Sequence, residues 1–293
     1  MLFKIVIFLA ALFILHQLFL TSKESFKGEK RQAKFETKEN DSIYDSFYAD
    51  IYDSLFSDPI KVKYEMNEII RSTNIDNDSI ILDLGVGTGD HLGYLKENIQ
   101  CIGLDTSKYM IAKAKKKYPN IVFKQGNALD TMNFVQNQFT HIFMLYFSIY
   151  YIQDKSTLFQ NMYHWLKPGG YIAIHLVNKH KFDPIVNASN PLIMLSPQRY
   201  AKKRITSSEI KFNDFKYKAN FKVDKDQTTF EETITDDETG NVRKHIHILY
   251  METQKEILSI ATQSGFNLIG KIDLVNCQYE YQYVYILQRP GAN

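Results

Sequence analysis

The residues whose type and spacing best suit ligand chemistry are three alternating glycines. Gly85, Gly87 and Gly89 directly follow the apolar run 80–84. Missing side chains let a ligand approach the backbone, and a helix that begins near Asp90 and runs through Leu95 and Lys96 would offer free N–H groups to it. A tight turn without a ligand is the alternative. Three glycines in five residues behind a buried strand favour a nucleotide-type ligand over that alternative.

Asp105 is the second residue with a chemical signature. It follows the apolar segment 100–104, about twenty residues after Gly85, where doubly wound α/β folds place an acid that binds ribose hydroxyls. The alternative role is a helix cap, because Asp105, Thr106 or Ser107 can cap the helix expected over 108–117. Both roles are compatible, since the strand end and the helix start coincide.

The glycine spacing argues against a dinucleotide oxidoreductase. The dinucleotide fingerprint is G-x-G-x-x-G, whereas this chain has G-x-G-x-G with Asp90 at the place of the third glycine of the fingerprint. A carboxylate there would face a pyrophosphate at a helix N-terminus, which is electrostatically unfavourable. The pattern therefore favours a ligand with ribose hydroxyls and an amino-acid end but no pyrophosphate.

These motifs resemble those of the class I S-adenosylmethionine-dependent methyltransferases. The glycine motif of that family is matched by Asp83-Leu84-Gly85-Val86-Gly87-Thr88-Gly89, and its second acid by Asp105. Its Gly-Asp-Ala motif reads Gly126-Asn127-Ala128, and its Lys-Pro-Gly-Gly turn is present at 167–170. The resemblance covers Tyr44 to about Leu287. It implies an α/β fold with a doubly wound, mostly parallel seven-stranded sheet, and S-adenosyl-L-methionine as the cofactor.

The resemblance also assigns the cofactor site. Met110 is expected to pack on the adenine, and Asn127 to accept a hydrogen bond from the adenine amino group through its carbonyl oxygen. Tyr44, Tyr48 and Tyr52 lie at helical spacing, so one face can close over the cofactor with ring faces toward the sulfonium, although core packing is an equally open role for each. The expected cofactor-binding residues are Tyr44, Tyr52, Asp83, Gly85, Gly87, Gly89, Asp105, Met110, Asn127, Ala128 and Tyr146.

Within that family the chain most resembles small-molecule methyltransferases that N-methylate sugars and amino acids. Such enzymes often carry a histidine near the place where this chain has Tyr151. Tyr151 follows the fourth expected strand, at the carboxyl edge where doubly wound sheets bind ligands, and is expected to orient the acceptor or take its proton. Methyl transfer is an in-line displacement in which the protein mainly aligns the nucleophile and excludes water. The expected function is methyl transfer to a small-molecule amine or hydroxyl. A lipid or quinone acceptor, and a non-catalytic cofactor-binding module, are the alternatives.

The histidines do not form a recognisable metal site, and no metal is assigned. His245 and His247 alternate on one face of an expected strand, which either turns toward a cavity or, more often, is an exposed polar sheet face. No third ligand accompanies them. His141 and His175 fall in apolar strands and are expected to be hydrogen-bonded core residues.

The elements around these residues alternate between strand and helix except in one region. Residues 179–250 contain period-two segments and a turn at 239–241, which predict an inserted antiparallel sheet. The insertion is expected to cover the active site, to form the face of a homodimer, or to do both. A helix that begins with a capping box at Thr253 and a final hairpin over 267–287 complete the main sheet.

The overall composition excludes several classes of protein. Lys and Arg number 35 against 33 Asp and Glu, a balance that argues against a dedicated nucleic-acid partner. The chain has two cysteines, Cys101 and Cys277, which excludes a disulfide framework and a cysteine-rich zinc site.

The first twenty residues form an apolar segment near the length that crosses a bilayer. A cleaved signal peptide and a buried core helix are the alternatives, but no small-residue cleavage site follows and the apolar residues cover all helix faces. Basic residues between Lys23 and Lys34 follow the segment, so the positive-inside rule places the catalytic domain in the cytosol. The expected organisation is a transmembrane anchor at 1–20, a polar flexible or frayed helical linker at 21–41, and a methyltransferase domain at 42–293.

Overall fold

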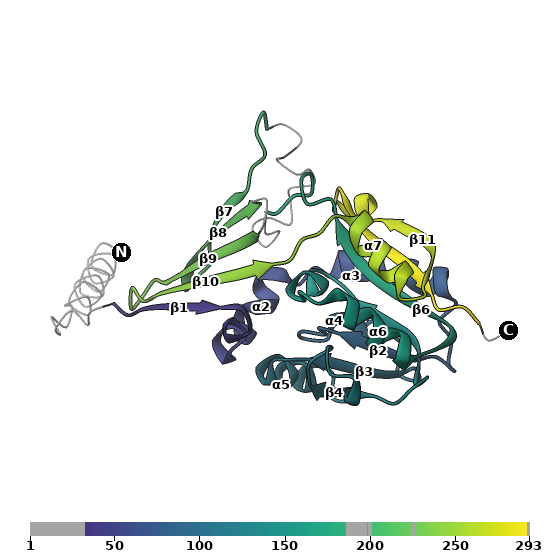
Figure 1. Ribbon diagram of the computed structural model, residues 1–293. Helices are drawn as coiled ribbons and strands as arrows, with labels where there is room; N and C mark the ends of the chain where they lie inside the picture. The colour runs from purple at the N-terminus through teal and green to yellow at the C-terminus, as the bar shows by residue number, and fades with distance from the viewer. Residues whose placement is uncertain (1–32, 186–197, 199–200, 224–226, 292–293) are drawn as a thin grey trace, which may run out of the picture. The chain divides into compact units, whose positions relative to one another are not determined.

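The computed structural model describes residues 33–185, 198, 201–223 and 227–291 of the chain (Figure 1). The expected anchor at 1–20 and the linker up to residue 32 lie outside the described residues. Among the described residues, no helix is long and apolar enough to cross a membrane.

The apolar segments next to the glycine motif form the centre of a seven-stranded sheet, sheet B, in the order β11-β12-β6-β5-β2-β3-β4 (Figure 1). Neighbouring strands are parallel except that β12 runs antiparallel to both β6 and β11. This arrangement confirms the predicted doubly wound, mostly parallel α/β sheet. Its strands are β2 (Ile80–Leu84), β3 (Gln100–Asp105), β4 (Val122–Gln125), β5 (Phe139–Met144), β6 (Leu166–Val177), β11 (Asn267–Asp273) and β12 (Gln282–Gln288).

Helices cover both faces of sheet B, which is why its central strands are continuous apolar runs. Buried side chains of α6 (Lys155–Trp165) and α7 (Gln254–Gln263) share one core with the sheet. Those of α3 (Pro59–Thr73) and α5 (Lys108–Lys117) share the other. The predicted capping box at Thr253 begins α7. Short 3-10 turns are η1 (Asn40–Ile43), η2 (Thr131–Asn133), η3 (Ser148–Tyr151) and η6 (Leu274–Cys277).

The insertion, together with strand β1 (Phe35–Glu39), forms a second sheet, sheet A, in the order β1-β10-β9-β8-β7. Its antiparallel strands are β7 (Ser207–Lys211), β8 (Phe215–Val223), β9 (Thr228–Asp236) and β10 (Val242–Leu249), in agreement with the sheet predicted within 179–250. One face of sheet A packs on α2 (Ser46–Phe56) through a separate apolar cluster that includes Leu55, Tyr217 and Ile234.

The expected linker was wrong at its C-terminal end. Strand β1 (Phe35–Glu39) pairs in parallel with β10, and Ile43 in η1 is fully buried. The polar sequence of β1 is that of an exposed edge strand, which satisfies backbone groups at the edge of β10. A flexible linker and an edge strand share this composition, so composition alone does not separate them.

Two local predictions around the glycine motifs also need correction. The helix after Gly89 was expected to run past Leu95, but α4 (Asp90–Gly93) is a single turn. A Cβ at Gly93 would lie 2.2 Å from the Tyr118 ring, so this glycine is required by the close approach of Tyr118. The Lys-Pro-Gly-Gly segment is not a turn before β6 but an irregularity within it, where the register with β5 shifts.

Candidate active site

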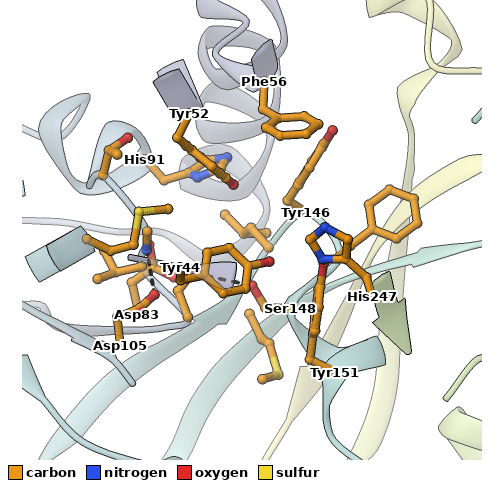
Figure 2. Close-up of a pocket in the computed structure, with 18 of the residues that line it drawn as sticks. Tyr44, Tyr52, Phe56, Asp83, His91, Asp105, Tyr146, Ser148, Tyr151 and His247 are labelled. Carbon is orange, nitrogen blue, oxygen red and sulfur yellow. Dashed lines mark hydrogen bonds between the residues drawn. The ribbon is translucent and has the colours of Figure 1, made fainter. Parts of the chain in front are cut away.

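A cavity of about 500 Å³ lies at the carboxyl ends of the central strands of sheet B, where doubly wound folds bind ligands (Figure 2). The glycine loop and Asp105 line one part of it. The face of sheet A that packs on α2, its inner face, lines another part through Phe221, Phe230 and His247. The structure therefore joins residues of the predicted cofactor site and of the insertion in one cavity.

The glycine loop leaves β2 with positive φ angles that favour glycine. Gly85 has φ +71°, and a Cβ there would lie 2.6 Å from Ser148 Oγ. Gly87 has φ +56°, and its Cβ would meet only the Tyr52 ring, at 3.9 Å. Gly85 is therefore required by packing, whereas the backbone of Gly87 faces open space in the cavity.

Asp105 holds the glycine loop in place, and its carboxylate oxygens can still accept hydrogen bonds from a ligand. One oxygen, Oδ2, accepts a hydrogen bond from Gly87 N at 3.0 Å, and the other, Oδ1, accepts one from Ser107 N at 2.8 Å. Burial raises its pKa, and these two hydrogen bonds oppose the rise. Each carboxylate oxygen can accept further hydrogen bonds, so the group fits a ribose diol. Ser107 caps α5, so Asp105 is not the cap of this helix. Its side chain contacts the glycine loop and lines the cavity.

The expected adenine contacts lie on the same wall of the cavity. Met110 and Ala128 are buried, and Asn127 is exposed at its rim. Asn127 Oδ1 accepts a hydrogen bond from Leu129 N at 2.9 Å, which orients the side chain and leaves a second lone pair on that oxygen. This wall fits an adenine with an apolar contact and one polar acceptor.

Asp83 is buried at the end of β2 and lines the cavity. Burial raises its pKa to about 7; the charge of His91 lowers it, and that of Asp105 raises it further. Near neutral pH the carboxyl group is therefore about half protonated in the cofactor-free protein.

This pKa has a consequence for stability that can be measured. The folded-state pKa is raised above the ordinary value of 3.8, so the contribution of Asp83 to stability is full below pH 4 and is lost as pH rises through 7. We expect the unfolding free energy of the wild type relative to Asp83→Asn to fall by up to about 4 kcal/mol between pH 4 and pH 8. Urea unfolding of the two cofactor-free proteins across this range measures the difference. Parallel curves for the two proteins would contradict it.

The predicted tyrosines are only partly arranged as expected. Tyr52 lies on α2, but Tyr44 precedes the helix and is positioned by Ser107 Oγ, which donates to its carbonyl at 2.6 Å. Tyr44 and Tyr52 line the cavity, as does Tyr146, whose φ of 54° is unusual for an aromatic residue. Tyr48 also lines the cavity, and it donates its hydroxyl hydrogen bond to Glu232.

A buried polar cluster on the inner face of sheet A was missed by the sequence analysis. The carboxylate of Glu232 lies within hydrogen-bond distance of four side chains, those of Tyr48, Tyr217, His245 and His247. The interpretation of His245 and His247 as an exposed sheet face is wrong, because both are buried. Alternation along β9 and β10 was the available signal, but it does not tell which face is covered.

Tyr151 connects this cluster to the cavity. Its hydroxyl lies 2.9 Å from His247 Nδ1, and Nε2 of the same ring lies 2.7 Å from Glu232 Oε2. In Figure 2 the side chains of Tyr44 and Tyr151 point toward His247. The structure therefore supplies a histidine beside Tyr151, but from the insertion and not from the segment after β5.

The other two strand histidines are hydrogen-bonded in the core, as expected. His141 Nε2 lies 3.1 Å from the carbonyl oxygen of Thr73, and His175 Nε2 lies 3.1 Å from Gln282 Oε1. Burial lowers the pKa of His175 to about 4, so this ring is neutral at physiological pH.

Comparisons with known proteins agree with this geometry. Residues 81–170 match the methyltransferase domain family. A demethylmenaquinone methyltransferase of Chlorobaculum parvum is 36% identical over 92 residues, which are 31% of this chain and 37% of the relative. A dTDP-3-amino-3,4,6-trideoxy-alpha-D-glucopyranose N,N-dimethyltransferase of Streptomyces venezuelae is 26% identical over 140 residues, 45% of this chain and 58% of the relative. The chain thus spans less than two thirds of the length of these curated relatives.

The solved structures extend the similarity of fold to most of the chain. An S-adenosylmethionine-dependent methyltransferase from Clostridium acetobutylicum superimposes with a TM-score of 0.64 at 17% identity, covering 84% of this chain and 98% of that one. Residues 81–170 therefore match the methyltransferase domain family in sequence, and the chain has a class I methyltransferase-like fold.

Proposed function

We propose that this protein transfers a methyl group from S-adenosylmethionine to an amine or hydroxyl of a small molecule. The observation that carries the proposal is the continuous cavity that joins the glycine loop and Asp105 to the inner face of sheet A. When bound, the cofactor supplies a methyl group already activated on a sulfonium. Asp105 would hold the ribose, and Met110 with Asn127 the adenine.

The chain's own task is to align the acceptor and exclude water. Sheet A covers the cavity with buried apolar and aromatic side chains, among them Phe221 and Leu249, and the buried Phe182 from the segment after β6 also lines it. Tyr151 and His247 add polar groups to this wall. A mostly aromatic wall with few polar groups suits a planar or ring-shaped acceptor that is oriented by one or two hydrogen bonds.

Two acceptor classes fit this wall and are separated by experiment. The aminosugar methyltransferase among the relatives supports an amine, and the demethylmenaquinone methyltransferase supports a quinone or lipid. We favour the small-molecule amine or hydroxyl, because Tyr151 and His247 place hydrogen-bonding groups in the cavity.

Calorimetric titration with S-adenosylmethionine, followed by transfer of labelled methyl groups to acceptor pools, tests the proposal. We expect binding, and labelled product from pools of amines or phenols. Label that appears only in lipid or quinone extracts would show that the acceptor is a lipid or quinone and not an amine or hydroxyl compound. Binding without transfer to any pool would indicate a cofactor-binding module, and absence of binding would overturn the proposal altogether.

We further propose that residues 1–20 anchor the protein in a membrane with the catalytic domain in the cytosol, and that sheet A contributes to a homodimer. The apolar run and the basic residues that follow it support the anchor. Carbonate-resistant membrane association of the full chain, lost on deletion of residues 2–20, is the expected result. Sedimentation of the purified protein tests the dimer.

A further inference from the structure

We propose that Glu232, His247 and Tyr151 form a proton relay, in which Tyr151 accepts the proton of the methyl acceptor and passes its own proton to His247. The inference rests on the proposed function and identifies its general base. It also states what the acceptor must be, a molecule whose attacking nitrogen or oxygen carries a proton at neutral pH.

The charge state of Glu232 sets the direction of the hydrogen bonds. Four side chains, those of Tyr48, Tyr217, His245 and His247, lie within hydrogen-bond distance of this carboxylate, and hydrogen bonds to a carboxylate favour its charged form. Burial opposes this effect, but the pKa of Glu232 is lowered in the folded protein. The group is therefore an anion at physiological pH and accepts hydrogen bonds only. Because His247 Nε2 lies 2.7 Å from it, that nitrogen carries a proton.

The tautomer of His247 then follows. In the tautomer that carries its single proton on Nε2, the Nδ1 atom is an acceptor, so the Tyr151 hydroxyl at 2.9 Å donates to it. The Tyr44 hydroxyl donates to the Tyr151 oxygen and takes one of its lone pairs. The other lone pair remains for the methyl acceptor in the cavity, which Tyr151 lines. A tyrosine held in this way accepts a hydrogen bond from an acceptor N–H or O–H group.

The proposed step balances atoms and charge. The acceptor atom forms a bond to the methyl carbon as the carbon–sulfur bond breaks, with the electron pair staying on sulfur. The proton of the acceptor moves to Tyr151, and the hydroxyl proton of Tyr151 moves to His247 Nδ1. The positive charge thus ends on an imidazolium paired with the carboxylate of Glu232, which acts through His247 as a positioning residue. Water later removes the proton.

The surroundings favour this transfer of charge. The groups that face His247 and Tyr151 from the neighbouring elements are Tyr44, the α2 residues Tyr48 and Tyr52, Tyr146, Tyr217 on β8, Glu232 on β9 and His245 on β10. Burial raises the pKa of Tyr44, Tyr48, Tyr52 and Tyr217, so these residues stay neutral. Glu232 is then the anion in contact with the ring of His247.

Tyr151→Phe and His247→Gln test the relay, with Tyr163→Phe and His164→Gln on α6 as matched controls outside the cavity. We expect kcat to fall about 100-fold or more in both relay variants, within the range of general acid–base catalysis. The calorimetric affinity for S-adenosylmethionine should stay within about twofold of the wild type. The controls should match the wild type in both measurements.

The acidity of the acceptor gives a sharper criterion. With a series of phenols, the loss caused by Tyr151→Phe should be large for phenols that are protonated at the assay pH and should vanish for those already ionised. An equal loss across the series would show that Tyr151 only shapes the cavity and would overturn the relay.

The tautomer of His247 gives a readout that needs no turnover. Nitrogen NMR of the cofactor-free protein, with the His247 signal identified by its loss in His247→Gln, should show a proton on Nε2 and none on Nδ1 at pH 8. The opposite tautomer would overturn the relay even if the protein is an active methyltransferase. If the wild type methylates no acceptor, the proposed function fails, and the NMR result still decides whether the hydrogen-bond chain is oriented as proposed.

Discussion

Replacing Asp105 by alanine is expected to weaken binding of S-adenosylmethionine at least about 100-fold while the protein stays folded. The variant removes the two hydrogen bonds proposed to the ribose hydroxyls, and hydrogen bonds to a charged group contribute about 1.5–3 kcal/mol each. It also removes the bond from Gly87 N that holds the glycine loop. Burial raises the pKa of Asp105, which means that the folded state disfavours the charged form of this carboxyl group. Removing the side chain should therefore leave the fold intact.

Calorimetric titration measures this affinity, and thermal unfolding reports the fold. Asp130→Ala is the matched control, since Asp130 also accepts a backbone hydrogen bond, from Met132 N at 3.0 Å, but does not line the cavity. If Asp105→Ala binds S-adenosylmethionine as tightly as Asp130→Ala does, the proposed ribose site at Asp105 is refuted. Gly87→Val is a poorer probe, because a β-branched residue at φ +56° strains the loop directly.

Replacing Glu232 by alanine is expected to cost about 3–5 kcal/mol of stability, because it leaves its buried hydrogen-bond partners without their acceptor. The neighbouring residue on β9 is a matched control. Glu231 lies on the opposite face of the same strand, where it pairs with Lys222 at 2.9 Å and Lys244 at 3.4 Å. Such pairs near the surface contribute at most about 1 kcal/mol, so Glu231→Ala should have a small effect. Similar losses for the two variants in urea unfolding would count against the cluster.

The same carboxyl group predicts a pH dependence. The pKa of Glu232 is lowered from 4.5 to about 2 in the folded state, so its contribution to stability is present above pH 4.5 and is lost as pH falls toward 2. The loss is about 3 kcal/mol. Glu232→Ala should therefore show a weaker decline of unfolding free energy than the wild type over this interval.

The residues of the half of the cavity that we propose to bind the cofactor could be predicted from the sequence to lie together. Gly85, Gly87 and Asp105 are close in the chain, and their positions depend on one strand, one tight loop and the next strand. Local patterns of this kind have few structural solutions. Met110 and Ala128 follow because parallel strands end at the same edge of the sheet.

The acceptor half was not predictable in the same way. Glu232 and His247 meet Tyr151 through contacts between residues far apart in the chain, and the pairing of β9 with β10 fixes only which residues are neighbours. Which face of sheet A is covered depends on where α2 packs, and the alternation of residue types does not determine it. Similarly, the parallel pairing of β1 with β10 could not be predicted from the five residues of β1, four of which are polar.

The two-part construction of the cavity bears on how such a protein changes over evolutionary time. The ribose and adenine contacts proposed above come from residues 83–128, whereas Phe221, Phe230 and His247 belong to β8–β10. Under the proposed function, substitutions in the inserted strands would alter the choice of methyl acceptor and leave the contacts to the methyl donor unchanged. Exchanging this insertion with that of a relative would then change acceptor selectivity without rebuilding the cofactor site.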